Sequence, residues 1–250
     1  DAYARQLAYH IALIVVEDDR AVPRLLEEHN GTLAGVIMLG GGDLNSQIIT
    51  AAMKEKLPAV LVDNYLLEPP IDAVLPDYTS GAALATQYLL QQGYRRIAFL
   101  RGSNRYRSLI ERYRGYCIAM HEAGIGIDPA LIQPYLSESH PTVGYLEMKA
   151  LLQSGTQFDS VFCVSDQTAF GALQALQEAG VRVPDDVAVL GFDNVAQSSY
   201  TTPPLTTVNV PKRAMGEIAV HRLVEKIDGQ VFDMPVKLTL PTSLVIRASA

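Results

Sequence analysis

Short apolar runs alternate with amphipathic stretches along this chain, most clearly between Asp159 and Pro211. The apolar run Val161–Val164 is short and rich in valine and phenylalanine, which is typical of a strand buried on both faces. Apolar residues then recur at the spacing of one helix face, and Gly180 follows where a helix would end: Ala169, Ala172, Leu173 and Leu176. A second apolar run, Val187–Leu190, completes a strand–helix–strand unit. Such units form parallel sheets with right-handed crossovers.

The same alternation continues on both sides of this segment. Further strands are predicted at Ile11–Val16, Val36–Leu39, Ala59–Val62, Ile97–Leu100, Val236–Leu240 and Ser243–Ile246. Helices are predicted at Ala21–Glu28, Ser46–Lys56, Gly81–Gln91 with Ser80 as its cap, Ile110–Met120, Thr142–Gln153 and from Pro211 onward. Two rounds of alternating strand and helix predict an α/β fold with doubly wound parallel sheets.

Composition places the chain among globular proteins large enough for one large or two medium domains. It has 250 residues, of which 48% are hydrophobic and 19% charged. No apolar run approaches the roughly 20 residues that a membrane-spanning helix needs. The first ten residues lack the charged, apolar and small-residue order of a signal peptide, so a cytoplasmic location is expected.

Charge and residue clusters exclude several functions. The net charge of −7 predicts that this chain by itself does not bind the phosphate backbone of DNA. The five histidines are scattered and no HxxxH or CxxC pair occurs, so neither a metal nor another cofactor is expected. Neither a GxSxG elbow nor a GxGxxG turn is present. Cys117 and Cys163 are expected to be apolar core groups without a structural disulfide.

Polar residues follow the predicted strands directly, at the ends where open α/β sheets bind ligands. Ser165 and Asp166 follow one strand, and Asp193 and Asn194 follow the next. The two carboxylates could accept hydrogen bonds from a ligand's hydroxyls or amines. The alternative is a helix-capping Asp followed by a structural Asp-Asn turn.

Two sequence blocks carry a resemblance to a known family. The segments SDQTAFGALQALQEAGVRVPDDVAVLGFDN, from Ser165 to Asn194, and SSYTTPPLTTVNVPKRAMGEIAVHRLVEKIDG, from Ser198 to Gly229, resemble the lac/gal-repressor family of bacterial transcription regulators. The match extends from about Leu33 to Arg247 and covers the effector-binding core, without a DNA-binding headpiece.

The resemblance implies the domain organisation. It implies two similar lobes, each a doubly wound parallel sheet flanked by helices, with a ligand cleft between them, as in type I periplasmic binding proteins. Three crossings join the lobes, expected near Leu100, Asn209 and Leu240. The N-terminal lobe is then 1–100 plus 209–240, and the C-terminal lobe is 101–208 plus 241–250.

The resemblance also implies ligand-binding residues. Arg112 matches the arginine of the R-x-x-G-[FYW] motif that extends into the cleft, and Asp193 in GFDN matches the effector-binding acid. Tyr106 and Ser108 precede Arg112 in the loop from which the family also contacts its effector. From the residues alone, Arg112 could instead be a surface arginine paired with Glu111 or Glu122, and Asp193 an Asx turn.

Three further candidates lie at predicted strand ends: Tyr65, Asp77 and Ser165. The ring of Tyr65 could stack on a sugar or a base, or it could simply cover the edge of a lobe.

Together these features predict the effector-sensing part of a transcription regulator, not an enzyme. A small polar effector, a sugar or sugar derivative, would bind the cleft. A homodimer would relay this binding to DNA through a headpiece outside this chain, with no membrane partner. The alternative is a periplasmic sugar-binding protein of a transporter. A third class, an enzyme on a doubly wound fold, would require turnover of a bound sugar.

Overall fold

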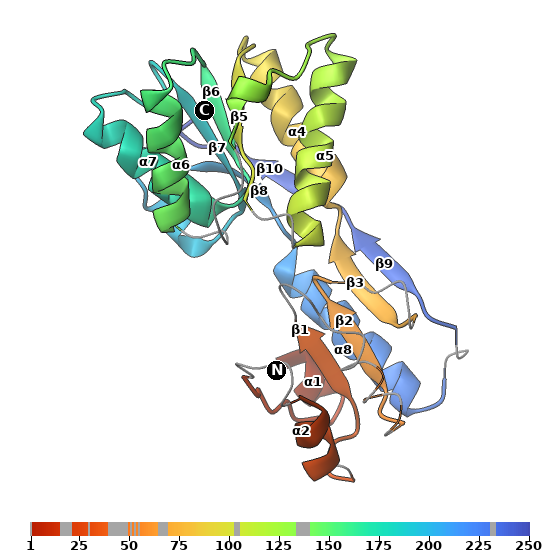
Figure 1. The fold of residues 1–250 in the computed structure, drawn as a ribbon. Coiled ribbons are helices and arrows are strands. Elements are labelled where there is room, and N and C mark those ends of the chain that lie inside the picture. The colour runs from red at the N-terminus through yellow and green to blue at the C-terminus, as the bar shows by residue number, and fades with distance from the viewer. Residues whose placement is uncertain are drawn as a thin grey trace. The chain divides into compact units, whose positions relative to one another are not determined.

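The computed structural model divides the chain into two compact units (Figure 1). It describes residues 2–15, 22–29, 31–39, 50, 52, 54, 56–64, 70–102, 106–133, 141–230 and 234–250. Unit 1 comprises Asp1–Pro76 and Pro211–Leu240, and unit 2 comprises Asp77–Val210 and Pro241–Ala250.

Unit 1 contains a parallel sheet of order β1-β2-β3-β9. The strands are β1 Val36–Leu39, β2 Ala59–Val62, β3 Asp72–Pro76 and β9 Lys237–Leu240, and the helices are α1 Ala2–Gln6, α2 Val22–Glu28 and α8 Lys212–Ile227. Helix α8 packs against β1, β2 and β3. Leu61 and Leu75 belong to a buried cluster that includes Leu26 of α2, and the alternate residues Val60 and Val74 are buried as well. The central strands β2 and β3 are therefore covered on both faces, as a parallel sheet requires.

One buried carboxylate fastens α8 to this sheet. Asp72, at the start of β3, is 1% exposed. Its Oδ2 lies 3.0 Å from both Arg222 Nε and Lys226 Nζ of α8, and Val236 N donates to Oδ1 at 2.6 Å. Burial raises the pKa of Asp72, but the hydrogen bonds from Val236, Lys226 and Arg222 outweigh burial and hold that pKa below its ordinary value.

Replacing Asp72 with alanine is expected to lower the free energy of unfolding of unit 1 by about 3 kcal/mol at pH 7, because two cations lose their buried partner. Since the folded pKa of Asp72 is depressed, its contribution is present above the unfolded pKa and is lost as the pH falls through the folded value. Urea unfolding at pH 7 and in acid measures both effects, and the difference from the unchanged protein should shrink in acid.

The matched control is Asp228→Asn, at the exposed end of α8. It should change the free energy of unfolding by less than about 0.5 kcal/mol. An equal effect of the two substitutions, or a loss at position 72 that grows in acid, would contradict this role for Asp72.

Unit 2 contains a sheet of order β10-β8-β7-β6-β4-β5, in which only the β10–β8 pair is antiparallel among the described strands. The strands are β4 Ile97–Leu100, β5 Ile132–Gln133, β6 Ser160–Cys163, β7 Ala188–Asp193, β8 Thr206–Asn209 and β10 Ser243–Val245. The helices are α4 Tyr78–Gln91, α5 Arg107–Glu122, α6 Pro141–Gln153 and α7 Asp166–Glu178, with short 3-10 turns η2 Pro129–Leu131 and η3 Ala196–Ser199.

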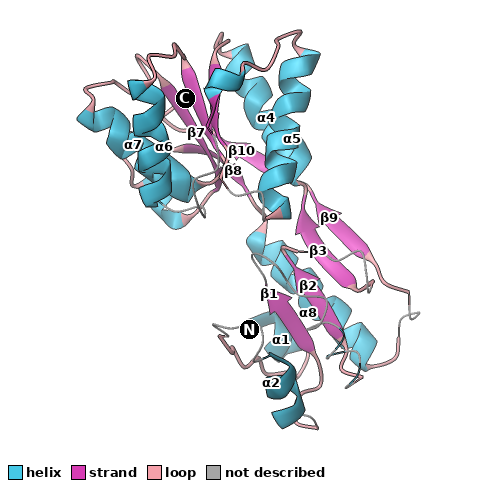
Figure 2. Ribbon diagram, in the orientation of Figure 1, coloured by secondary structure: helices cyan, strands magenta, loops and turns pink. Residues whose placement is uncertain are grey.

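Helices cover both faces of this sheet (Figures 1 and 2). Helices α6 and α7 pack together and enclose a core with Leu100, Val161 and Cys163. Helices α4 and α5 also pack together, and the ring of Tyr116 on α5 lies 4.9 Å from that of Phe99 on the other face of β4. Because successive strand residues point to opposite faces, the sheet forms the middle of three layers.

The structure places the first crossing between units elsewhere than the sequence suggested. The boundary lies between Pro76 and Asp77, not near Leu100, because β4 pairs with β5 and β6, and α4 packs on α5. Residues 77–100 therefore belong to unit 2. The other two breaks follow Val210 and Leu240, within a residue or two of the predicted positions.

The predicted strand Ile11–Val16 is wrong over its described part. Residues 11–15 have no regular structure, and Leu13 and Val15 are 81% and 80% exposed. An apolar run becomes a strand only where a neighbour supplies backbone hydrogen bonds, and no described strand pairs with these residues. Val16 and most of the predicted helix Ser46–Lys56 lie outside the described residues.

Candidate functional site

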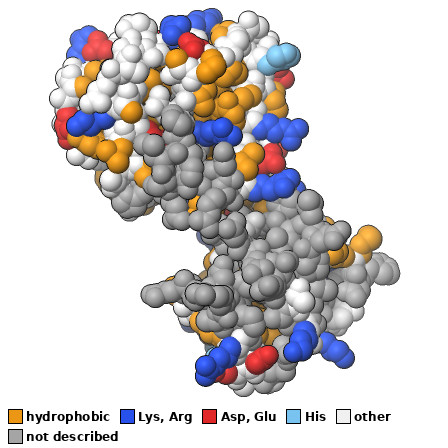
Figure 3. Space-filling model, viewed as in Figure 1, with side chains coloured by type: hydrophobic (Ala, Val, Ile, Leu, Met, Phe, Trp, Pro, Cys, Tyr) orange, Lys and Arg blue, Asp and Glu red, His pale blue; other side chains and the backbone are white. Residues whose placement is uncertain are grey.

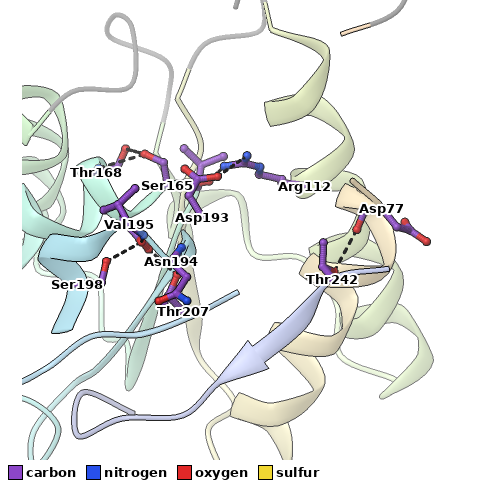
Figure 4. A network of polar contacts seen from close by, with 12 residues as sticks. Asp77, Arg112, Ser165, Thr168, Asp193, Asn194, Val195, Ser198, Thr207 and Thr242 are labelled. Carbon is purple, nitrogen blue, oxygen red and sulfur yellow. Dashed lines mark hydrogen bonds and ion pairs between the residues drawn. The ribbon is translucent and has the colours of Figure 1, made fainter. Parts of the chain in front are cut away.

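A buried arginine links the carboxyl ends of two neighbouring strands in unit 2 (Figure 4). Arg112 lies in the second turn of α5 and is 5% exposed. Its Nη1 donates to the carbonyl oxygen of Val164 at 2.7 Å, just after β6, and its Nη2 donates to Asp193 Oδ1 at 2.8 Å, at the end of β7. The guanidinium also lies 4.0 Å from the ring centroid of Phe192 and 5.0 Å from that of Tyr78. Cation–π attraction and two charge-assisted hydrogen bonds therefore fix one orientation of this side chain.

The topology of unit 2 explains how these residues meet. Strands β4, β6 and β7 are parallel neighbours, so their carboxyl ends share one edge of the sheet. Helix α5 is the next helix after β4 in the chain, and its first turns stand at that edge. This edge is where open α/β sheets bind their ligands.

Arg112 keeps one donor unused. Among the described residues its Nε has no hydrogen-bond partner, although the atom is buried. A buried donor without an acceptor is costly, above all on a charged group. The site therefore retains hydrogen-bonding capacity on the cation.

The turn after β7 has unusual backbone angles. Asp193 has φ 116° and Asn194 has φ 49°, values that non-glycine residues rarely adopt. The side chain of Asn194 is held on both sides, since its Nδ2 donates to Asn209 Oδ1 at 3.0 Å and Arg247 Nη2 donates to its Oδ1 at 2.8 Å. This turn presents the Asp193 carboxylate to Arg112.

Beneath the turn lies a second carboxylate, Asp166, in the first turn of α7 with no exposed surface. Val195 N donates to its Oδ2 at 2.9 Å and Ser198 Oγ to the same oxygen at 2.6 Å. Thr207 Oγ1 donates to its Oδ1 at 2.5 Å. Burial raises the pKa of Asp166 above its ordinary value, and the hydrogen bonds from Ser198, Thr207 and Val195 oppose that rise only in part.

Two of the alternatives left open by the sequence now have a structural answer. Arg112 is not a surface arginine paired with Glu111 or Glu122, because it is buried and pairs with Asp193. The helix cap is Ser165, whose Oγ accepts from Thr168 N at 3.2 Å, while Asp166 lies under the turn.

The remaining predicted residues are placed differently. Tyr106 and Ser108 are half-buried at the start of α5, and Ser108 precedes Arg112 by four residues on the same helix face. Asp77 is the N-cap of α4, with Ser80 N donating to its Oδ1 at 2.9 Å, where the sequence suggested Ser80 as the cap. Figure 4 draws Asp77 just before α4 and beside Thr242, apart from the Arg112–Asp193 pair. Tyr65 lies outside the described residues.

Sequence reasoning missed several contributors to this site. The aromatic rings of Phe192 and Tyr78 and the carbonyl of Val164 all contact Arg112. Phe192 and Val164 directly adjoin the predicted residues Asp193 and Ser165, so their positions at strand ends were the available signal. Tyr78 carried no such signal, because its contact with Arg112 joins two helices distant in sequence.

Other kinds of site find no support in the described part of the chain. No cluster of three metal-ligating side chains occurs there. Cys117 and Cys163 are free thiols. No helix among those residues is both long and apolar enough to cross a membrane. On the coloured part of the face in Figure 3, Lys and Arg side chains form separate groups with Asp and Glu between them.

Comparison with known proteins agrees with this fold. Residues 86–250 match the family model of the periplasmic binding protein-like domain. The chain is 32% identical over 232 residues to the transcriptional repressor PurR of Histophilus somni, covering 91% of this chain and 69% of that protein. It is 35% identical over 173 residues to the ribose operon repressor of Haemophilus influenzae, covering 68% of this chain and 51% of that protein.

Solved structures of transcription regulators are also similar to this chain. The transcriptional regulator CelR in complex with cellobiose superposes with a TM-score of 0.90 at 30% identity, covering 100% of this chain and 76% of that one. The regulator CcpA of Lactococcus lactis superposes with a TM-score of 0.87 at 27% identity, covering 99% of this chain and 90% of that one.

The two α/β units, with polar groups gathered at a strand-end edge, define a periplasmic-binding-protein-like effector domain. The chain belongs to the effector-binding domains of LacI-family transcription regulators. It spans 51–69% of the length of the two repressors above. These relatives are named as a transcriptional repressor and a transcriptional regulator.

Proposed function

We propose that this chain senses a small hydroxyl-rich molecule, a sugar or sugar derivative, at the Arg112–Asp193 pair. The observation that carries the proposal is that pair itself, a charged donor and a charged acceptor at a strand-end edge beside an aromatic ring. A carboxylate accepts hydrogen bonds from two adjacent hydroxyls, and a guanidinium donates to hydroxyl oxygens from a rigid fork. Tyr106, Ser108 and Ser165 stand close enough in sequence to these elements to add further polar contacts.

The charges favour a neutral ligand over an anion. Arg112 is already compensated by Asp193 at 2.8 Å, and Asp166 lies close enough to Asp193 for their charges to interact. A phosphate or carboxylate would therefore contact one acidic group and one compensated cation, with a second, buried acidic group near Asp193. The CelR complex supports this preference, since the molecule named in its structure is the neutral sugar cellobiose.

In the whole regulator, binding would act on DNA through other parts of the molecule. We propose that the chain forms a homodimer, and that a DNA-binding headpiece responds to the effector through it. Coupling between two such sites is typically about 1–3 kcal/mol. The named relatives are repressors and regulators, which supports this role over a transport protein with the same fold. Sedimentation would separate the two, because a monomer with and without effector would favour transport.

A thermal-unfolding screen tests the proposal. Ribose and cellobiose represent neutral sugars, glucose 6-phosphate represents anions, and adenine and hypoxanthine represent bases. A neutral sugar is expected to raise the unfolding temperature by about 5 °C or more at concentrations far above its dissociation constant. Stabilisation by the phosphate or the bases, with no neutral sugar active in an extended panel, would overturn the proposed ligand class.

A further inference from the structure

The turn that carries Asp193 needs support from outside itself. Two consecutive non-glycine residues, Asp193 and Asn194, have positive φ values of 116° and 49°. Such backbone is strained and persists only where surrounding contacts hold it in place. Another group must therefore keep this turn in place.

Three groups near this turn donate hydrogen bonds to the Asp166 carboxylate. It accepts from the backbone of Val195, from Ser198 in η3 and from Thr207 in β8. Thr207 extends the contact, because its Oγ1 also accepts from Asn194 N at 3.3 Å. The amides of residues 194 and 195 are thus tied to one buried carboxylate, directly or through one hydroxyl.

We infer that Asp166 is a positioning residue of the effector site, which holds the turn after β7 so that the Asp193 carboxylate faces Arg112. Asp166 has no exposed surface and is not expected to touch the effector. The inference deepens the proposed function and rests on it only for the effector, since the Arg112–Asp193 geometry exists without one.

The chemistry at position 166 suits this role. Three donors converge on two oxygens, and an ionised carboxylate is a side chain that accepts without donating. No ion pair of Asp166 occurs among the described residues, and the nearby charge that acts on it is that of the like-charged Asp193. A buried carboxylate without a cation is costly, so a residue needed for packing alone would serve better uncharged.

The backbone of β7 is shaped around this carboxylate. A Cβ placed on Gly191 would collide with Asp166 Oδ1 and would approach the side chain of Leu205 to 2.9 Å. Glycine at this position therefore lets the carboxylate lie directly against the strand that ends in Asp193. The Asp166 carboxylate is therefore packed against β7 and bonded to the segment that follows the turn.

The experiment measures the coupling between Arg112 and Asp193 in the protein without effector. Arg112→Met, Asp193→Ala and the double variant form a double-mutant cycle, read by urea unfolding. The same cycle is repeated in the Asp166→Ala background. In the Asp166→Ala background the coupling constant is expected to be at least tenfold smaller, which is a loss of about 1.4 kcal/mol of coupling free energy. Thr207→Val, which keeps the carboxylate but removes one link, provides a milder background if Asp166→Ala does not fold.

A matched background separates positioning from general loss of stability. Leu151→Ala removes a fully buried side chain from α6 and lies outside the turn network. It should destabilise unit 2 while leaving the Arg112–Asp193 coupling intact. Unchanged coupling in both Asp166→Ala and Thr207→Val would overturn the inference, as would an equal loss of coupling in Leu151→Ala.

This outcome is independent of the sugar screen. Coupling that depends on Asp166 together with no sugar binding would uphold the inference and reject the proposed function. If a sugar binds but the Arg112–Asp193 coupling does not depend on Asp166, the proposed function stands and the inference is rejected.

Discussion

Replacing Gly171 with alanine is expected to destabilise unit 2 by about 3 kcal/mol or more, the upper part of the range for overpacking. Gly171 lies on α7 and faces α6, and a Cβ there would collide with the carbonyl oxygen of Pro141 and approach the backbone nitrogen of Tyr145. On the partner helix, a Cβ on Gly144 would collide with the carbonyl oxygen of Thr168. These neighbours are backbone atoms, so a change of rotamer cannot make room and the helices must separate.

The chain offers a control with the opposite expectation. Gly216 lies inside α8, and a Cβ there would meet no atom within 4 Å. Gly216→Ala should therefore stabilise unit 1, by up to about 1 kcal/mol, because alanine loses less backbone entropy in a helix. Urea unfolding followed by circular dichroism measures both variants. A Gly171→Ala protein as stable as Gly216→Ala would show that α6 and α7 pack less closely than described.

Strands buried on both faces were predictable from the sequence. The runs Ala59–Val62 and Ile97–Leu100 coincide with β2 and β4, and Val161–Val164 differs from β6 by one residue at each end. Each is wholly buried, so hydrophobicity alone marks it. Strand β3 escaped prediction because its run contains Asp72, a buried charge whose partners come from α8 and the segment before β9.

What depends on partners distant in sequence was less predictable. The run Ile11–Val15 is apolar enough for a strand, but hydrophobicity cannot say whether a neighbouring strand exists. The boundary after Pro76 depends on which of the two sheets β4 pairs with. The local sequence pattern does not reveal that pairing. Similarly, adjacent polar residues Ser165 and Asp166 have the same local context, yet one caps a helix and the other supports the turn after β7.

Arg112 and Asp193 are expected to show the largest effects on effector binding. Alanine at either position should weaken the affinity for whichever neutral sugar stabilises the unchanged protein by about tenfold to a hundredfold, since hydrogen bonds to charged groups contribute about 1.5–3 kcal/mol each. Isothermal titration measures the change. The control is Arg213→Ala, whose side chain is 93% exposed and pairs with Glu217 on α8, and which should leave the affinity unchanged.

A conservative replacement sharpens this test. Arg112→Lys keeps the positive charge but loses the planar fork that reaches Val164 O and Asp193 Oδ1 together. If the effector depends on the fork, lysine should weaken binding nearly as much as alanine, whereas a site that needs only charge would tolerate it. If both alanine variants keep full affinity and the same sugar-induced stabilisation, the effector binds elsewhere in the protein. A ligand that uses this pair could not lose either partner without a loss of affinity.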